Sequence, residues 1–326
     1  MTARFLFSAN YLKVCYNKPY KTKTEDIMDY SQILSQQFNI KEEYAKNIIT
    51  LLDDDNTIPF IARYRKEMHG SMDDQLIREF AEKLEYLRGL DKRRDEIRSL
   101  IDAQEKLTDE INLALDKAAT LSELEDIYRP YRPKRKTRAS IAKEKGLEPL
   151  ANDILKQEKG FDPSKSAVDY IDEEKGVTSV EDAIQGAMDI IAELVSDNAE
   201  IRKRIRNLTN ANGVLVSVAT DEEKDSVYKN YYDYKEPVKK IAGHRVLAVN
   251  RGEKEGFLKV SVETDSEKPL NSIFRAMITD KNQLCSDIIR EACTDAYQRL
   301  IYPSIEREVR NDLTDTASEN AMKVFA

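Results

Sequence analysis

Apolar side chains recur at helical spacing along most of the chain, and the first such pattern lies near residue 30. Ile33, Leu34 and Phe38 predict a short helix that ends at Asn39. Four further apolar residues predict a second helix that closes at residues 53–56: Tyr44, Ile48, Ile49 and Leu52. Two short helices joined by a tight turn resemble a helix-turn-helix, which is also a common packing unit. Acidic residues at both ends of the second helix oppose contact with phosphates, so we interpret the pair as a structural helical hairpin.

One long helix is predicted over residues 72–102. Its apolar residues recur at spacings of three, four or seven, as in a coiled-coil seam: Leu76, Phe80, Leu84, Leu87, Leu90, Ile97 and Ile101. Shorter helices are predicted at 108–118 and 121–128, and Thr120 with Glu123 predicts a capping box for the second of these. Further helices are expected at about 147–157, 180–196 and 197–210.

The pattern changes at Gly213. The segment at 214–218 is short, rich in valine and bounded by turn residues, and this pattern predicts a strand. Residues 257–262 predict a second strand, in which Phe257 or Leu258 alternates with Val260 and Val262. The apolar run at 243–250 fits either a strand or a helix, because periodicity does not discriminate between them over so short a length.

Helical spacing returns from Thr279 onward. One side of the predicted helix carries Leu284, Ile288, Ala292 and Leu300, and Pro303 ends or kinks it before a final helix that runs toward Ala326. Cys285, Ile289 and Cys293 are spaced four apart on one stripe. No histidine or cationic cluster adjoins the two cysteines in sequence, so we interpret them as buried structural thiols.

These elements define a fold class that is mainly α: a multihelical scaffold with a helix-turn-helix-like hairpin and a small α/β insertion. The composition agrees, because the chain of 326 residues has only ten glycines and nine prolines, too few for a turn-rich β fold. We divide the chain into a helical region at 28–212, a small α/β segment at 213–265 and C-terminal helices at 266–326.

Residues 1–27 differ from the rest, since basic and aromatic side chains alternate there without a helical period. Such a mixture binds single-stranded nucleic acid in some proteins. We instead expect an extension that is disordered or not native to the protein, because termini often lack structure.

Few residues are suited to catalysis. The chain has two histidines and three cysteines, and it contains no glycine-rich phosphate loop, no CxxC or HExxH motif and no GxSxG elbow. His69 lies in a polar turn and is expected at the surface, whereas His244 is expected to pack or to form a hydrogen bond. Acidic runs at 53–55 and 221–223 lack calcium-ligand spacing and are interpreted as solvated loop ends. We therefore expect no enzyme activity, no cofactor and no metal site.

No apolar run reaches the ~18 residues that span a bilayer, and the odd number of cysteines favours a reducing compartment. The expectation is a cytoplasmic protein with no membrane partner.

Charge is segregated, although the net charge is −8. Residues 129–138 contain six cations and no acid, with two prolines that favour an extended, stiffened loop: Arg129, Arg132, Lys134, Arg135, Lys136 and Arg138. Tyr128 and Tyr131 lie among them, and basic extended backbone with aromatic rings suits a surface that follows phosphates. A second basic set is Arg63, Arg65 and Lys66, and a third is Arg202, Lys203, Arg204 and Arg206. The alternative is that these cations pair internally with the excess carboxylates or with another domain.

Several segments together resemble one family. They are residues 57–67 (TIPFIARYRKE), 84–88 (LEYLR), 124–135 (LEDIYRPYRPKR), 142–150 with GLEPL at its end, and HR at 244–245 with RGEKEG at 251–256. From residue 28 onward the chain resembles the bacterial Tex transcription accessory proteins, which are related to a eukaryotic elongation factor that also handles nucleosomes.

The resemblance implies a nucleic-acid-binding scaffold in transcription, with RNA and/or DNA as partners and RNA polymerase or other transcription machinery as further partners. Members of the family are longer and continue into a YqgF domain, helix-hairpin-helix repeats and an OB-fold RNA-binding domain. We therefore expect the chain to be an N-terminal fragment. The alternative hypothesis is a protein-interaction scaffold that positions those domains or contacts the transcription machinery without touching nucleic acid.

Overall fold

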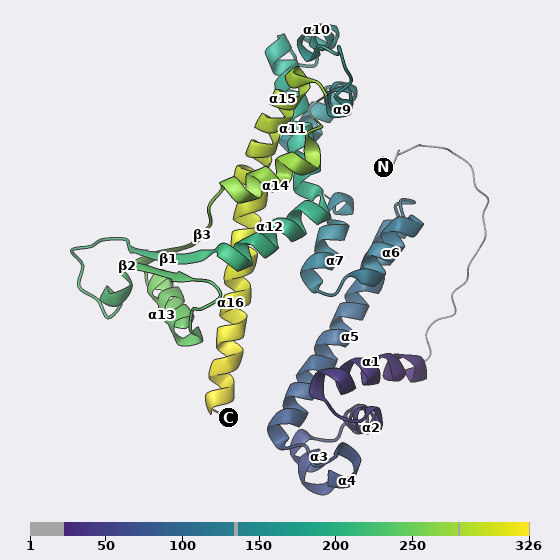
Figure 1. Cartoon of the computed structure of the whole chain (residues 1–326), viewed down its shortest axis with the longest axis vertical. Coiled ribbons are helices and arrows are strands. Elements are labelled where there is room, and N and C mark those ends of the chain that lie inside the picture. The colour runs from purple at the N-terminus through teal and green to yellow at the C-terminus, as the bar shows by residue number, and fades with distance from the viewer. Residues whose placement is uncertain (1–22, 134–135, 280, 326) are drawn as a thin grey trace. The chain divides into compact units, whose positions relative to one another are not determined.

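The computed structural model describes residues 23–133, 136–279 and 281–325, and the fold is mainly α with one small antiparallel sheet (Figure 1). The chain forms two compact units, an N-terminal unit (Met1–Glu96) and a C-terminal unit (Ile97–Ala326). The long helix α5 (Asp74–Asp102) crosses the division between them. Among the described residues, no helix is both long and apolar enough to cross a membrane.

The N-terminal unit packs its helices around one apolar cluster. The predicted hairpin consists of α1 (Lys23–Phe38) and α2 (Glu42–Asp53), and the turn after it leads into α3 (Ile58–Tyr64) and α4 (Lys66–His69). Leu34, Ile48, Ile61 and Phe80 are fully buried, and the Phe38 and Phe80 rings lie 5.4 Å apart. The predicted helices are confirmed, but Ile33 and Leu76 are largely exposed and their neighbours Leu34 and Ile77 fill the core instead.

His69 is buried, so the prediction of a surface imidazole is wrong. Its side chain is 0% exposed, and Nε2–H donates a hydrogen bond to the Ile61 carbonyl oxygen over 3.1 Å. The segment is a short helix that ends at Gly70 in the left-handed conformation (φ 63°), not a polar loop. A Cβ at Gly70 would lie 2.5 Å from the Tyr44 ring, which explains why glycine is needed at this position.

The C-terminal unit begins with helices that are mostly short. They are α6 (Asp109–Lys117), α7 (Leu121–Tyr128), α8 (Arg138–Glu144), α9 (Glu148–Lys156), α10 (Pro163–Ala167), α11 (Val180–Asp197) and α12 (Ala199–Asn212), with single 3₁₀ turns at Arg129–Tyr131 (η1) and Val168–Tyr170 (η2). Thr120 caps α7 as predicted by accepting from the Glu123 N–H, whereas the Glu123 carboxylate accepts from the Ala119 N–H. The helices α8 and α10 were not predicted, because seven and five residues are too few for a period to be recognised.

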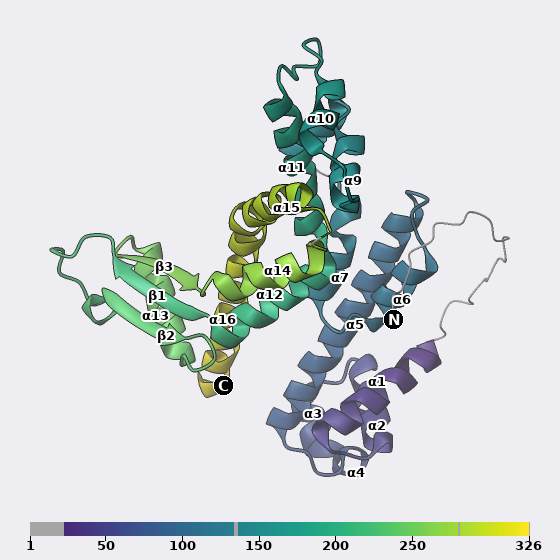
Figure 2. The ribbon, with the colours of Figure 1, turned by 45° about the horizontal axis from the view of Figure 1, so that its top comes forward.

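The small sheet has the order β2-β1-β3, and both pairs are antiparallel (Figure 2). The predicted strands are β1 (Val214–Ala219) and β3 (Leu258–Glu263), with Leu258 rather than Phe257 starting the buried alternation. The unpredicted strand β2 (Asp233–Pro237) is polar along its length. The ambiguous run at 243–250 is helical and belongs to α13 (Gly243–Lys254), whose Val249 packs against Leu215 and Val260 of the sheet.

Helices also form the C-terminal part of the chain. They are α14 (Glu267–Met277), α15 (Gln283–Asp295), the π-helical segment η4 (Ala296–Ile301) and α16 (Tyr302–Phe325). Pro303 does not end the helix, because it follows the π-helical segment. Proline in a regular α-helix would meet the carbonyl four residues earlier, and a π-bulge relieves that crowding.

Cys285 and Cys293 are buried thiols, as predicted. Both are 0% exposed, and neither takes part in a disulfide bond. The buried face of α15 contains Cys285, Ile289 and Cys293, whereas Leu284 is exposed. Burial raises the pKa of both thiols, that of Cys293 to about 12.

The burial of these thiols predicts their reactivity. In a Cys15→Ser variant, we expect no thiol to react with Ellman's reagent at pH 8 until denaturant is added, because the thiolate is the reactive form and its pKa is raised by burial. Two thiols should then react together on unfolding. Reaction of either thiol in native buffer at the rate of a free cysteine would contradict this account.

The two histidines form a matched pair for a stability test. We expect His69→Ala to destabilise the N-terminal unit by about 2–4 kcal/mol, because it leaves a cavity and removes a buried hydrogen bond. His244, which the sequence predicts to pack or to form a hydrogen bond, is exposed and serves as the control, so His244→Ala should change stability by less than about 0.5 kcal/mol. Amide hydrogen exchange in α2 and α3 of the full chain measures the effect. Equal protection in the two variants would refute the role assigned to His69.

Candidate nucleic-acid interface

The predicted basic loop begins with a turn of helix, not with extended backbone. Residues Arg129–Tyr131 continue α7 as the 3₁₀ turn η1, so the prediction of an extended loop is wrong for these three positions. Pro130 is tolerated there because it lies at the start of the 3₁₀ turn, after α7 has ended at Tyr128, where no N–H is needed from it. The backbone becomes extended at Arg132 (φ −66°, ψ 132°), and α8 begins at Arg138.

Four of the six predicted cations of this loop can be located. Arg129 is about one-third exposed and pairs with Asp197 at 3.3 Å. Arg132 is more exposed, pairs with Glu125 and lies over the Tyr128 ring, 5.7 Å from its centre. Lys136 is 69% exposed and 3.7 Å from Glu144, and Arg138 is exposed at the start of α8. Lys134 and Arg135 lie outside the described residues.

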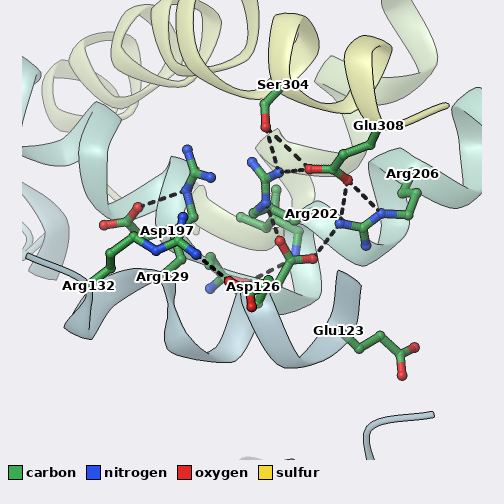
Figure 3. A network of polar contacts seen from close by, with 12 residues as sticks. Glu123, Asp126, Arg129, Arg132, Asp197, Arg202, Arg206, Ser304 and Glu308 are labelled. Carbon is green, nitrogen blue, oxygen red and sulfur yellow. Dashed lines mark hydrogen bonds and ion pairs between the residues drawn. The ribbon is translucent and has the colours of Figure 1, made fainter. Parts of the chain in front are cut away.

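The end of α7 is attached to the rest of the C-terminal unit by a buried network of ion pairs (Figure 3). The Asp126 carboxylate accepts from Arg202 Nε at 2.5 Å and from Arg206 Nη2 at 2.7 Å. On the opposite side, Glu308 accepts from Arg202 at 2.8 Å and from Arg206 at 2.8 and 2.9 Å. Ser304 accepts a further bond from Arg202 at 3.0 Å. The network therefore joins α7, α12 and α16.

The side chains at the centre of this network are removed from solvent. The side chain of Arg202 is 0% exposed, that of Asp126 6% and that of Arg206 11%. Burial alone lowers the pKa of Arg206, but Asp126 and then Glu308 outweigh burial, so its pKa is raised. The two arginines and two carboxylates neutralise each other, which is the condition for burying ions at tolerable cost.

The third predicted basic set is consequently not a surface cluster. The hypothesis that Arg202 and Arg206 contact phosphate is wrong, because both are buried and paired, and Lys203 pairs with Glu123 at 2.8 Å. Lys203 and Arg204 of this set are exposed, but they lie beside two buried arginines and do not form a continuous basic surface with them. The spacing offered a signal that the sequence analysis missed: Arg202, Arg206 and Thr209 follow one helical face, and all three are buried.

Arg129 lies beside this network. Burial lowers its pKa, and the neighbouring positive charge of Arg202 lowers it further, while Asp197 partly compensates. An arginine remains charged despite such a shift. The pair between Arg129 and Asp197 thus fixes η1 to the end of α11, and the chain leaves that turn at Arg132.

The second predicted basic set is exposed in the N-terminal unit. Arg63, Arg65 and Lys66 are exposed where α3 ends and α4 begins. The Arg65 guanidinium lies over the Phe60 ring at 5.4 Å, and Phe60 in turn lies 5.4 Å from the ring of Tyr64, which is 66% exposed. This surface therefore presents both positive charge and an accessible aromatic ring.

Within the described residues, no group of three or more His, Cys, Asp or Glu side chains could hold a metal ion. The geometry instead offers two exposed surfaces that carry cations and aromatic rings. Electrostatic and stacking contacts are the interactions that such surfaces make.

Comparisons with known proteins give consistent matches. A family model for the Tex-like protein N-terminal domain matches residues 28–102, and one described as Tex central region-like matches residues 158–325. The protein YdcI of Bacillus subtilis is 42% identical over 306 residues, which are 92% of this chain and 43% of that protein. The transcriptional accessory protein Tex of Neisseria gonorrhoeae is 35% identical over 310 residues, 92% of this chain and 40% of that protein.

A eukaryotic relative is also similar. The human S1 RNA-binding domain-containing protein 1 is 30% identical over 323 residues, which are 94% of this chain and 32% of that protein. The chain therefore spans less than half of the length of each of these relatives.

The buried network predicts a large effect of one substitution in α7. We expect Asp126→Asn to destabilise the C-terminal unit by about 3–5 kcal/mol, because it leaves two buried guanidinium groups with one anion between them. Thermal unfolding of the full chain, followed by circular dichroism, measures the loss.

Glu123→Gln is the matched control. It breaks another ion pair between α7 and α12, but its partner Lys203 is half exposed, so the cost should be less than about 1 kcal/mol. If both variants unfold at the same temperature as the unsubstituted chain, the network does not hold α7 in place.

Proposed function

Because the chain belongs to the Tex protein family, we propose that it is a nucleic-acid-binding scaffold that assists transcription. In this proposal, phosphates of RNA or DNA lie along the basic loop, which we define as residues 129–138. The names of two relatives support it, since one is a transcriptional accessory protein and another contains an S1 RNA-binding domain.

The observation that carries the proposal is that exposed cations follow a turn that is held in place. Arg132, Lys136 and Arg138 are exposed within seven positions, and the turn before them is held by Arg129 and Asp197. Exposed ion pairs such as Lys136 with Glu144 contribute only about 0–1 kcal/mol. A phosphate can therefore replace the carboxylate at little cost, and a polyanion can engage several of these cations at once.

The exposed set in the N-terminal unit provides a second contact surface in this proposal. Arg63, Arg65 and Lys66 supply positive charge, and Tyr64 supplies an aromatic face beside them. Bases stack on such faces in proteins that bind single strands.

Binding is the whole of the proposed activity. Electrostatic and stacking contacts need no cofactor, no metal and no catalytic residue. RNA polymerase or other transcription machinery is the proposed protein partner, and the proposed location is the cytoplasm.

A protein-interaction scaffold is the second candidate function. It is favoured by one observation: Arg129, Arg132 and Lys136 each already pair with a carboxylate, and an acidic protein surface would present the same group. In that case the loop would bind a protein partner and would not bind nucleic acid.

A salt titration separates the two candidates. We expect labelled single-stranded RNA and DNA to bind the full chain with an affinity that falls linearly with salt on logarithmic axes. Lys136→Glu should weaken binding and reduce the slope by about 0.7–0.9, the value for one lost phosphate contact. Fluorescence anisotropy between low and moderate salt measures both quantities.

Lys165→Glu is the control for this experiment. Lys165 is 87% exposed and pairs with Asp162 at 3.2 Å, so the same change of charge occurs outside the basic loop. Its slope should equal that of the unsubstituted chain. Absence of binding at low salt, or equal slopes for both variants, would favour the protein-interaction scaffold.

A further inference from the structure

A hollow of about 230 Å³ opens beside η1 in the C-terminal unit. Its walls are mainly apolar and come from three helices and the turn: Ile111, Ala114, Ile127, Pro130, Tyr131 and Ala199. Glu110, Asp126 and Asp197 add carboxylate groups to the lining. The hollow thus combines apolar surfaces with hydrogen-bond acceptors.

This hollow adjoins the basic loop directly. Pro130 and Tyr131 belong to both, and Arg129, the residue before them, pairs with Asp197 of the lining. Arg132, an exposed cation of the basic loop, directly follows Tyr131 of the lining.

The wall of the hollow that η1 forms is held in place. The Tyr131 carbonyl accepts a hydrogen bond from Gln104 Nε2 at 2.9 Å, which ties η1 to the turn that follows α5. Burial raises the pKa of the Tyr131 phenol, so the ring remains neutral at physiological pH. The nearby Asp126 and Asp197 are neutralised by arginines, which limits their repulsion of phosphates.

We propose that this hollow, the base pocket, binds one unstacked nucleobase of a single strand whose phosphates contact the basic loop. This inference rests on the proposed function. A base offers flat faces for apolar walls such as Pro130 and Tyr131, and exocyclic amino groups for the carboxylates of Glu110 and Asp197. In a duplex the bases are paired and stacked, so the base pocket selects single strands over double strands.

The test compares three probes on the full chain: a short DNA single strand, the same sequence as a duplex, and an abasic strand with the same number of phosphates. We expect the single strand to bind about tenfold more tightly than the abasic strand, the size of one base–aromatic stacking contact. Replacing one base with 2-aminopurine should give a fluorescence change on binding.

Filling the base pocket provides the second arm. Ala199→Leu places a larger side chain in the hollow at the first turn of α12, and Ala211→Leu makes the same change at an exposed position in the last turn. Ala199→Leu should remove the preference for the base-bearing strand and leave duplex binding unchanged. Ala211→Leu should behave as the unsubstituted chain, and circular dichroism verifies that both variants fold.

The outcomes distinguish this inference from the proposed function. If no probe binds at low salt, both are overturned. If single strand, duplex and abasic strand bind equally, nucleic-acid binding stands and the base pocket is refuted. The abasic comparison on the unsubstituted chain decides the question even where Ala199→Leu fails to fold.

Discussion

The buried ion pairs between Asp126, Arg202, Arg206 and Glu308 are the constraint on which the C-terminal unit depends. They connect α7, α12 and α16, and the residues of a single bonded pair lie up to 106 positions apart in the chain. Removing one partner of such a buried set costs about 3–5 kcal/mol, far more than an exposed pair contributes. The turn η1, with which the basic loop begins, follows directly from the helix that this network holds.

The anchoring of the turn η1 has a consequence for the binding of a ligand. Side chains that project from an anchored turn lose less conformational freedom on binding than side chains on a mobile segment. Arg129 and Gln104 hold η1, while Arg132, Lys136 and Arg138 remain exposed. Arg202 and Arg206 hold the helix that leads into η1, and in the proposed function they position the exposed cations without contacting nucleic acid.

The sequence predicted the fold better than the site. Long amphipathic segments such as α5, α11 and α12 were predicted nearly to their ends, because their buried stripes extend over several turns. Polar β2 and short α8 were missed, since neither has an apolar period of sufficient length. Whether Arg206 is a surface cation or a buried one depends on Asp126 and Glu308, which are distant in sequence, so local charge patterns could not decide it.

Crosslinking tests the central claim most directly, namely that the basic loop contacts nucleic acid. A single strand that contains photoreactive 4-thiouridine would be bound to the full chain, irradiated and mapped by mass spectrometry. The account predicts crosslinks to peptides that contain Tyr131 or the exposed cations beside it, and their loss at high salt. Crosslinks that avoid residues 129–138 and map only elsewhere would contradict it.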